Sequence, residues 1–287
     1  TGDCEITVYP VFSGIELVYY DVHMQSCDID LAKGRKTLII THCQEGRIEF
    51  EYKNGEYLYL ASGDLSIQKN TENIRHRYCP LSHYHGVSVA IDMNRVPRCF
   101  SCILDDVFVS PEELEMKFCS EKPYSIMREN ISIEHIFSEL YSVPENIRKG
   151  YHKVKVLELL LFLSGLDYKG ESEERRYFSR SQVTAAKEAK KYLLAHLDEH
   201  ITITELADML GISSTSLKIC FKGVYGDTIN GYITNCKMQK AASLLKNTDK
   251  SVLEIAGIVG YNNGSKFAGA FRRVMNKSPN EYRKSLV

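Results

Sequence analysis

Two short spacings in the sequence bring together residue types that bind metals or react. His83 and His85 are separated by one residue, so on a β-strand both imidazoles lie on one face, as in the histidine pairs of metal-binding barrels. Metal enzymes of that kind also use a Glu a few residues later and a distant third His, whereas the first acid after His85 is Asp92. We therefore predict no metal site and interpret His83 and His85 as effector-binding residues.

Cys99 and Cys102 have the C-x-x-C spacing of redox pairs and zinc knuckles. The sequence has no second C-x-x-C and no thioredoxin-like β–α–β pattern around this one, so a thiol-based redox sensor remains an alternative. The nine cysteines form an odd and scattered set, which favours reduced thiols over a disulfide framework. Because nucleophile-elbow and phosphate-loop motifs are also absent from the sequence, we predict a protein without catalytic residues or cofactor.

The strongest chemical signal is a repeat in the last hundred residues. Residues 205–212 read ELADMLGI and residues 254–261 read EIAGIVGY, which is the same order of residue types at an offset of 49. After one inserted residue the match resumes at an offset of 50, where Phe221 corresponds to Phe271. A run of matches this long indicates two copies of one supersecondary unit.

Each copy is predicted to be a helix, a tight turn and a second helix. Ser251 and Glu254 have the spacing of a capping box before the first helix of the second copy, and Gly211 and Gly260 follow the first helices, where a positive φ is favoured. This arrangement places a second helix in a DNA major groove. The alternative is a helical repeat that binds protein.

The charge is unevenly distributed along the 287 residues. Residues 181–287 carry 15 Lys and Arg against 9 Asp and Glu, a net charge of +6, whereas residues 1–180 carry 21 against 28, a net charge of −7. The basic segment therefore suits a polyanionic partner. The longest apolar run, residues 159–163, is too short to cross a membrane, and no signal peptide opens the sequence, so we expect a cytoplasmic protein.

The elements that must position these groups differ between the two parts of the chain. Up to about residue 92 the pattern is of short strands joined by glycine-containing turns, with the clearest alternation over residues 47–60 and 83–92. This pattern predicts an antiparallel barrel or sandwich, whose inner face would hold His83 and His85 beside Val87 in an effector pocket. Beyond residue 110 helices are predicted from Pro111, over residues 131–141 and over the Leu-rich residues 151–166, the last contributing to a homodimer interface.

Residues 260–272 (GYNNGSKFAGAFR) and 278–283 (SPNEYR) resemble the signature of the AraC/XylS family of bacterial transcription regulators. Residues 217–245 are similar to the first half of that signature. The SKF form at residues 265–267 resembles the pyochelin-regulator-like branch, and residues 46–86 are similar to the cupin-like sensor domain of that branch.

The resemblance implies an α+β multidomain chain. Residues 1–110 are expected to form an antiparallel cupin-like β-barrel that senses an effector, and residues 111–168 a helical dimerisation segment. Residues 169–181 are the expected linker, and residues 182–287 an all-α double helix-turn-helix domain.

The resemblance also assigns the DNA-binding residues. Lys218 and Lys266 are the best candidates to reach guanine, whereas Ala268 and Gly269 stand where longer polar residues are common, which favours reading of shape or thymine methyls there. The full set on the outward faces of the two recognition helices is Ser214, Thr215, Ser216, Lys218, Ile219, Lys222, Asn263, Gly264, Ser265, Lys266, Ala268, Gly269, Arg272 and Arg273.

We therefore predict a ligand-responsive transcription regulator, activator or repressor, that binds double-stranded promoter DNA. Its expected partners are a small-molecule effector, a second copy of the chain and RNA polymerase, with no membrane. The competing interpretations are a cupin enzyme or small-molecule carrier, and the redox sensor built on Cys99 and Cys102.

Overall fold

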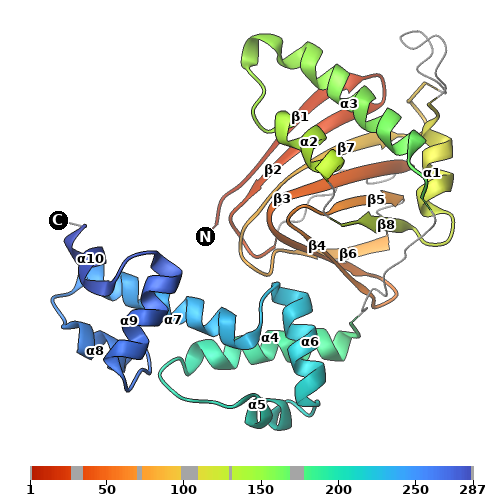
Figure 1. Ribbon diagram of the computed structural model, residues 1–287. Coiled ribbons are helices and arrows are strands. Elements are labelled where there is room, and N and C mark those ends of the chain that lie inside the picture. The colour runs from red at the N-terminus through yellow and green to blue at the C-terminus, as the bar shows by residue number, and fades with distance from the viewer. Residues whose placement is uncertain are drawn as a thin grey trace. The chain divides into compact units, whose positions relative to one another are not determined.

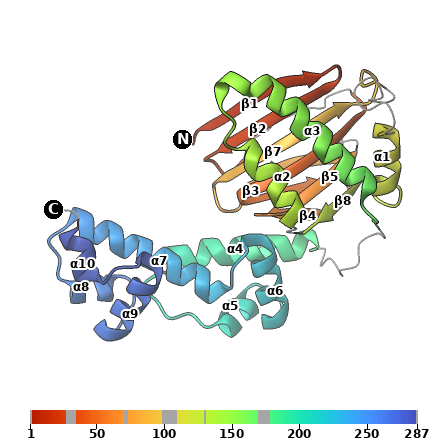
Figure 2. The ribbon, with the colours of Figure 1, turned by 45° about the horizontal axis from the view of Figure 1, so that its top comes forward.

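The computed structural model describes residues 2–26, 35–69, 73–97, 109–128, 131–168 and 178–285. The chain divides into two compact units, residues 1–177 and 178–287. The first is an antiparallel β-sheet with helices against it and the second is built of helices (Figures 1 and 2), which confirms the predicted fold class. Residues 169–177 of the predicted linker lie outside the described residues, as do Cys99 and Cys102.

The strands of the first unit form one antiparallel sheet in the order β1-β2-β7-β3-β5-β8, with β4 and β6 also paired to β3. The order ends at β1 and β8, so the described pairing is an open, bent sheet, and cupin-like closure into a barrel stays a prediction. The strands are β1 (Cys4–Phe12), β2 (Ile15–Val22), β3 (Thr37–Tyr52), β4 (Tyr57–Ala61), β5 (Leu65–Lys69), β6 (Ile74–Tyr78), β7 (Tyr84–Asp92) and β8 (Tyr124–Met127).

The long strand β3 serves both parts of this sheet because it bends in its middle. Its first half pairs with β5 and β7, and its second half pairs with β4 and β6. The bend coincides with a register shift between Cys43 and Glu45 and with Gly46, whose φ is +84°. A Cβ at Gly46 would lie 2.3 Å from the carbonyl oxygen of His83, so only glycine allows the two strands to approach here.

Helices cover the face of the sheet that carries Val87, Val89 and Ile91. These three side chains are fully buried in one core with residues of α1 (Pro111–Cys119), α2 (Ile131–Leu140) and α3 (Arg148–Gly165). The sequence pattern predicted that this face of β7 lines the interior of a barrel. In the structure the same face is covered by helices. The opposite face packs against β4 and β6 in a second core that includes Tyr84.

The Leu-rich helix α3 uses its apolar residues inside the first unit. Leu159, Leu160 and Leu163 are fully buried in the core shared with the sheet. Packing within the unit therefore accounts for the high leucine content of this helix, from which a dimer interface was predicted. The short strand β8, between α1 and α2, was not expected, because four residues carry too little periodicity and its pairing with β5 decides its conformation.

The second unit contains the two predicted copies, α5 with α6 and α8 with α9, joined by the long helix α7 (Figure 2). The N-terminal half of α7 packs in the first copy and its C-terminal half in the second. The helices are α4 (Arg180–Ala195), α5 (Ile203–Met209), α6 (Ser214–Tyr225), α7 (Ile229–Asn247), α8 (Val252–Ile258), α9 (Gly264–Met275) and α10 (Pro279–Lys284). Within the described residues, no helix combines the length and apolar character needed to cross a bilayer.

A buried histidine lies where the sheet meets α2. His42 of β3 is 4% exposed, and its ring stacks on Phe137 with 4.5 Å between centroids. Its Nδ1 is 3.1 Å from the Tyr141 hydroxyl, whereas its Nε2 is buried without a hydrogen-bond partner. Burial lowers the pKa of His42 to about 4, because the imidazolium would lose its hydration there.

This histidine makes the stability of the first unit depend on pH. The folded-state pKa of about 4 lies below the value of about 6.5 expected in the unfolded chain, so stability is fully present above pH 6.5 and is lost as the pH falls toward 4. The loss amounts to at most about 3 kcal/mol from this group. In His42→Leu the free energy of urea unfolding should fall less between pH 7 and pH 4.5 than in the wild type.

The exposed His135→Leu variant on α2 is the matched control and should keep the wild-type pH dependence. Equal pH dependence of His42→Leu and the wild type would show that His42 does not couple protonation to unfolding.

Candidate nucleic-acid interface

Each copy in the second unit begins with a capping box, as predicted for Ser251 and Glu254 in the second copy. In the first copy the N–H of Thr202 donates to Glu205 Oε2 at 2.8 Å, and in the second the N–H of Ser251 donates to Glu254 Oε2 at 2.7 Å. These hydrogen bonds from the backbone lower the pKa of both glutamates, which stay ionised at the positive ends of α5 and α8. Glu205 and Glu254 therefore serve to cap the N-termini of α5 and α8.

The turn between the two helices has the same hydrogen bonds in both copies. In the second copy the N–H of Gly260 donates to the Gly257 carbonyl at 2.9 Å, and the N–H of Tyr261 donates to the Ala256 carbonyl at 2.8 Å. The first copy has both bonds 49 residues earlier. Gly211 and Gly260 have φ of +65° and +75°, so the predicted left-handed turn residues are confirmed.

The second helices, α6 and α9, start at equivalent side-chain caps. The Ser213 hydroxyl accepts from the N–H of Ser216 at 3.1 Å, and Asn263 Oδ1 accepts from the N–H of Lys266 at 2.9 Å. Asn263 thus caps α9, and its side-chain oxygen is occupied by the helix.

The inner sides of α6 and α9 are anchored by aromatic rings. Phe221 and Phe271 are both fully buried. Phe221 meets Tyr232 edge-to-face at 5.6 Å and 76°, and Phe271 meets Tyr282 at 5.5 Å and 81°. The repeat seen in the sequence therefore extends to the geometry of its ring contacts, and it fixes which side of each helix faces outward.

The predicted contact residues lie on the other sides of these helices. Ser216 is also held by α4, since its hydroxyl accepts from Gln182 Nε2 at 3.1 Å. The exposed members are Thr215, Lys218, Lys222, Asn263, Ser265, Lys266, Gly269, Arg272 and Arg273, and the partly exposed ones are Ser214, Ser216, Ile219, Gly264 and Ala268.

The outward faces of α6 and α9 carry only positive charge. Neither helix contains an Asp or Glu, while α6 presents Lys218 and Lys222, and α9 presents Lys266, Arg272 and Arg273. Exposed basic side chains on two equivalent helices suit the phosphates and base edges of a nucleic acid.

Two glycines of α9 have different surroundings. A Cβ at Gly264 would lie 2.8 Å from Leu253 Cδ2, so this glycine serves the contact between α8 and α9. A Cβ at Gly269 would meet nothing within 4 Å. The fold itself does not require glycine at 269, where Ala would favour the helix by roughly 0.5–1 kcal/mol.

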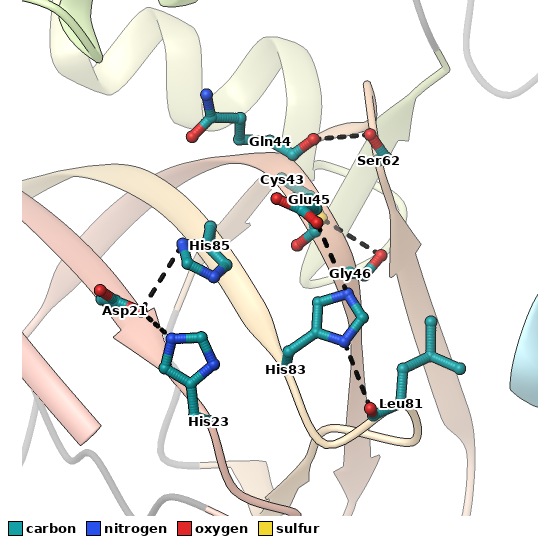
Figure 3. A network of polar contacts seen from close by, with 10 residues as sticks. All are labelled: Asp21, His23, Cys43, Gln44, Glu45, Gly46, Ser62, Leu81, His83 and His85. Carbon is teal, nitrogen blue, oxygen red and sulfur yellow. Dashed lines mark hydrogen bonds and ion pairs between the residues drawn. The ribbon is translucent and has the colours of Figure 1, made fainter. Parts of the chain in front are cut away.

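The two histidines assigned to an effector lie at one end of the first unit's sheet, and each has its own acidic neighbour (Figure 3). His83 immediately precedes β7, its side chain is 37% exposed, and its Nε2 is 4.0 Å from Glu45 Oε1. His85 lies on β7, its side chain is 29% exposed, and its Nδ1 is 3.6 Å from Asp21 Oδ1. Sequence spacing did not single out Asp21, which is far from His85 in the chain.

Comparison with known proteins finds a family match within the second unit. Residues 206–285 match the helix-turn-helix domain family. The chain is 31% identical over 153 residues to the xylose operon regulatory protein of Escherichia coli strain K12, covering 50% of this chain and 39% of that protein. It is 30% identical over 93 residues to the melibiose operon regulatory protein of the same strain, covering 32% of this chain and 31% of that protein.

Among solved structures, the chain is similar to the C-terminal domain of AraT, a response regulator from Geobacillus stearothermophilus. The two share 32% identity with a TM-score of 0.35, over 35% of this chain and 84% of that domain. The chain spans less than half the length of either curated relative, and the family match lies within its C-terminal unit. Residues 206–285 of this C-terminal unit are thus identified as a helix-turn-helix domain, and a putative AraC-like transcription regulator of Streptomyces lividans is among the chain's relatives, at 34% identity over 83 residues, 29% of this chain and 27% of that protein.

Proposed function

We propose that the chain is a transcription regulator that binds double-stranded promoter DNA through α6 and α9. The observation that carries this proposal is the pair of equivalent second helices, each anchored by a buried Phe on one side and basic on the other. If the repeat bound protein instead, acidic residues would be as acceptable as basic ones on the outward faces of α6 and α9, and both helices lack Asp and Glu. The similarity to regulators of the xylose and melibiose operons supports the same function.

Different side chains would then carry specificity and affinity. Lys218 and Lys266 lie in the N-terminal halves of α6 and α9, from which recognition helices reach base edges. Lys222, Arg272 and Arg273 lie in the last turns, and their long side chains suit phosphate contacts.

We assign effector sensing and self-association to the first unit. His83 and His85 support a ligand site, because both are partly exposed where the sheet ends. For a homodimer, the supporting surface is the outer side of α3 and its start, where Val154 is 61% and Ile147 47% exposed. RNA polymerase is the partner that regulation from a promoter requires.

Footprinting on promoter DNA adjacent to the gene tests the function as a whole. Two recognition helices should protect two major-groove segments about one helical turn apart, roughly 10 bp. Lys218→Ala and Lys266→Ala should each relax base preference in one segment and weaken specific binding by about 1–3 kcal/mol.

Lys191→Ala, an exposed lysine on α4, is the control and should leave both footprints intact. A footprint that neither recognition-helix variant changes would contradict the assignment of α6 and α9 to the DNA.

The salt dependence of binding separates phosphate contacts from base contacts. Each lysine or arginine that neutralises a phosphate contributes about −0.9 to the slope of log K against log salt concentration. Lys222→Ala and Arg272→Ala should therefore each flatten the slope by about one unit for specific and unrelated DNA alike. Slopes equal to the wild type in both variants, measured by anisotropy between 50 and 200 mM salt, would remove these residues from the phosphate contacts.

Gly269 tests how closely α9 approaches the DNA. Gly269→Ala should raise the melting temperature, because the methyl group meets no atom within 4 Å and alanine favours the helix. The same methyl group should weaken DNA binding several-fold if this face lies against the groove. The matched control is Gly257→Ala on α8, where a Cβ also meets nothing within 4 Å, and it should raise the melting temperature without loss of affinity. Full affinity of Gly269→Ala would show that position 269 stands away from the DNA.

A further inference from the structure

The end of the first unit's sheet, where β7 begins, carries a row of ionisable side chains across four neighbouring strands. Glu5 of β1 is directly opposite Asp21 of β2, Asp21 is opposite His85 of β7, and His85 is opposite Glu45 of β3. Residues opposite one another in antiparallel strands share a face, and their Cβ atoms are about 4.5–5.5 Å apart. The row therefore gathers acids and an imidazole on one face, and Asp21 Oδ1 lies 3.6 Å from His85 Nδ1 within it.

A second histidine completes a compact set within this row. His23 follows β2, two residues after Asp21, and its Nε2 is 2.8 Å from Asp21 Oδ1. His85 Nδ1 is 3.6 Å from the same oxygen, and one potential ligand atom from each of the three residues lies within 4.8 Å of the other two (Figure 3). The two imidazole rings are 5.1 Å apart, and each turns a nitrogen toward Asp21 Oδ1.

These spacings match the ligand set of a transition-metal ion. Nitrogen and oxygen ligands about 2.1 Å from a tetrahedral ion are about 3.4 Å from each other. The 3.6 Å between His85 Nδ1 and Asp21 Oδ1 lies close to this value, whereas the 2.8 Å between His23 Nε2 and the same oxygen is a hydrogen-bond distance that a bound ion would lengthen. The His23 side chain is 54% exposed, so rotation about its own bonds would bring the third pair into range.

The charge around the set also favours a cation. Glu5 and Asp21 are like charges directly opposite each other, an arrangement that destabilises a strand pair unless a positive charge lies between them. Asp21 and His23 are exposed and His85 is partly exposed, so water has access to complete the coordination of an ion.

We propose that Asp21, His23 and His85 bind a divalent transition-metal ion through two imidazole nitrogens and one carboxylate oxygen. This donor set suits Zn²⁺, with water in the remaining position. The site differs from the His83 and His85 pair that the sequence spacing suggests, because β2 supplies Asp21 and leads directly into His23, while His83 faces Glu45. The proposal is independent of DNA binding.

Calorimetric titration of the metal-free 287-residue chain with Zn²⁺ tests the site. His23→Gln, His85→Gln and Asp21→Asn should each weaken the affinity by about tenfold or more. His76→Gln, an exposed histidine on β6, is the matched control and should retain the wild-type affinity. Melting curves of the metal-free variants separate loss of a ligand from loss of the fold.

Cysteines are the competing ligands for Zn²⁺ in this chain. A Cys99→Ser/Cys102→Ser variant should still bind Zn²⁺, and Co²⁺ bound to the wild type should show no thiolate charge-transfer absorption. Zn²⁺ affinity that is unchanged in both His23→Gln and His85→Gln would overturn the proposal. Loss of all binding in the double serine variant would also overturn it.

Discussion

The burial of one side of α6 and α9 is the constraint on which the DNA-reading unit depends. Phe221 and Phe271 have no contact with water, and each is held by a tyrosine ring from a following helix. Once these rings are placed, the helical period of 3.6 residues decides which side chains face outward. The basic residues of α6 and α9 are exposed for that reason, and no separate interaction is needed to present them.

The short helices before each turn support the same arrangement. A seven-residue helix is too short to be stable alone, so α5 and α8 depend on their caps and on burial of residues such as Ala207 and Ala256. The small side chain of alanine allows close approach of the next helix, and the glycine at the turn redirects the chain. Caps, turn and packing therefore act together to set the angle at which each second helix leaves the first.

In the first unit, the register between paired strands determines which side chains lie together, as the helical period does in the second unit. The bend of β3 at Gly46 divides the sheet between two cores, one under the helices and one under β4 and β6. Beyond the region that the helices cover, the same rows of side chains become polar, and Tyr19, Asp21 and His23 succeed one another on one face of β2 and its extension. The ionisable row at this end is thus the continuation of a core face into solvent.

Much of the second unit was predictable from the sequence because its determining interactions are local. Capping boxes and glycine turns act within about four residues, so the capping box of Ser251 with Glu254 and the positive φ of Gly260 could be predicted from the order of residues.

Two features of the first unit could not be predicted in this way, because partners far along the chain determine them. They are the strand β8 and what covers the face of β7 that carries His85. Alternation correctly placed Val87 and His85 on one face, but only packing showed that helices cover it. Asp21 and His85 are 64 residues apart, and they meet because hydrogen bonding between β2 and β7 fixes a register that no local pattern encodes.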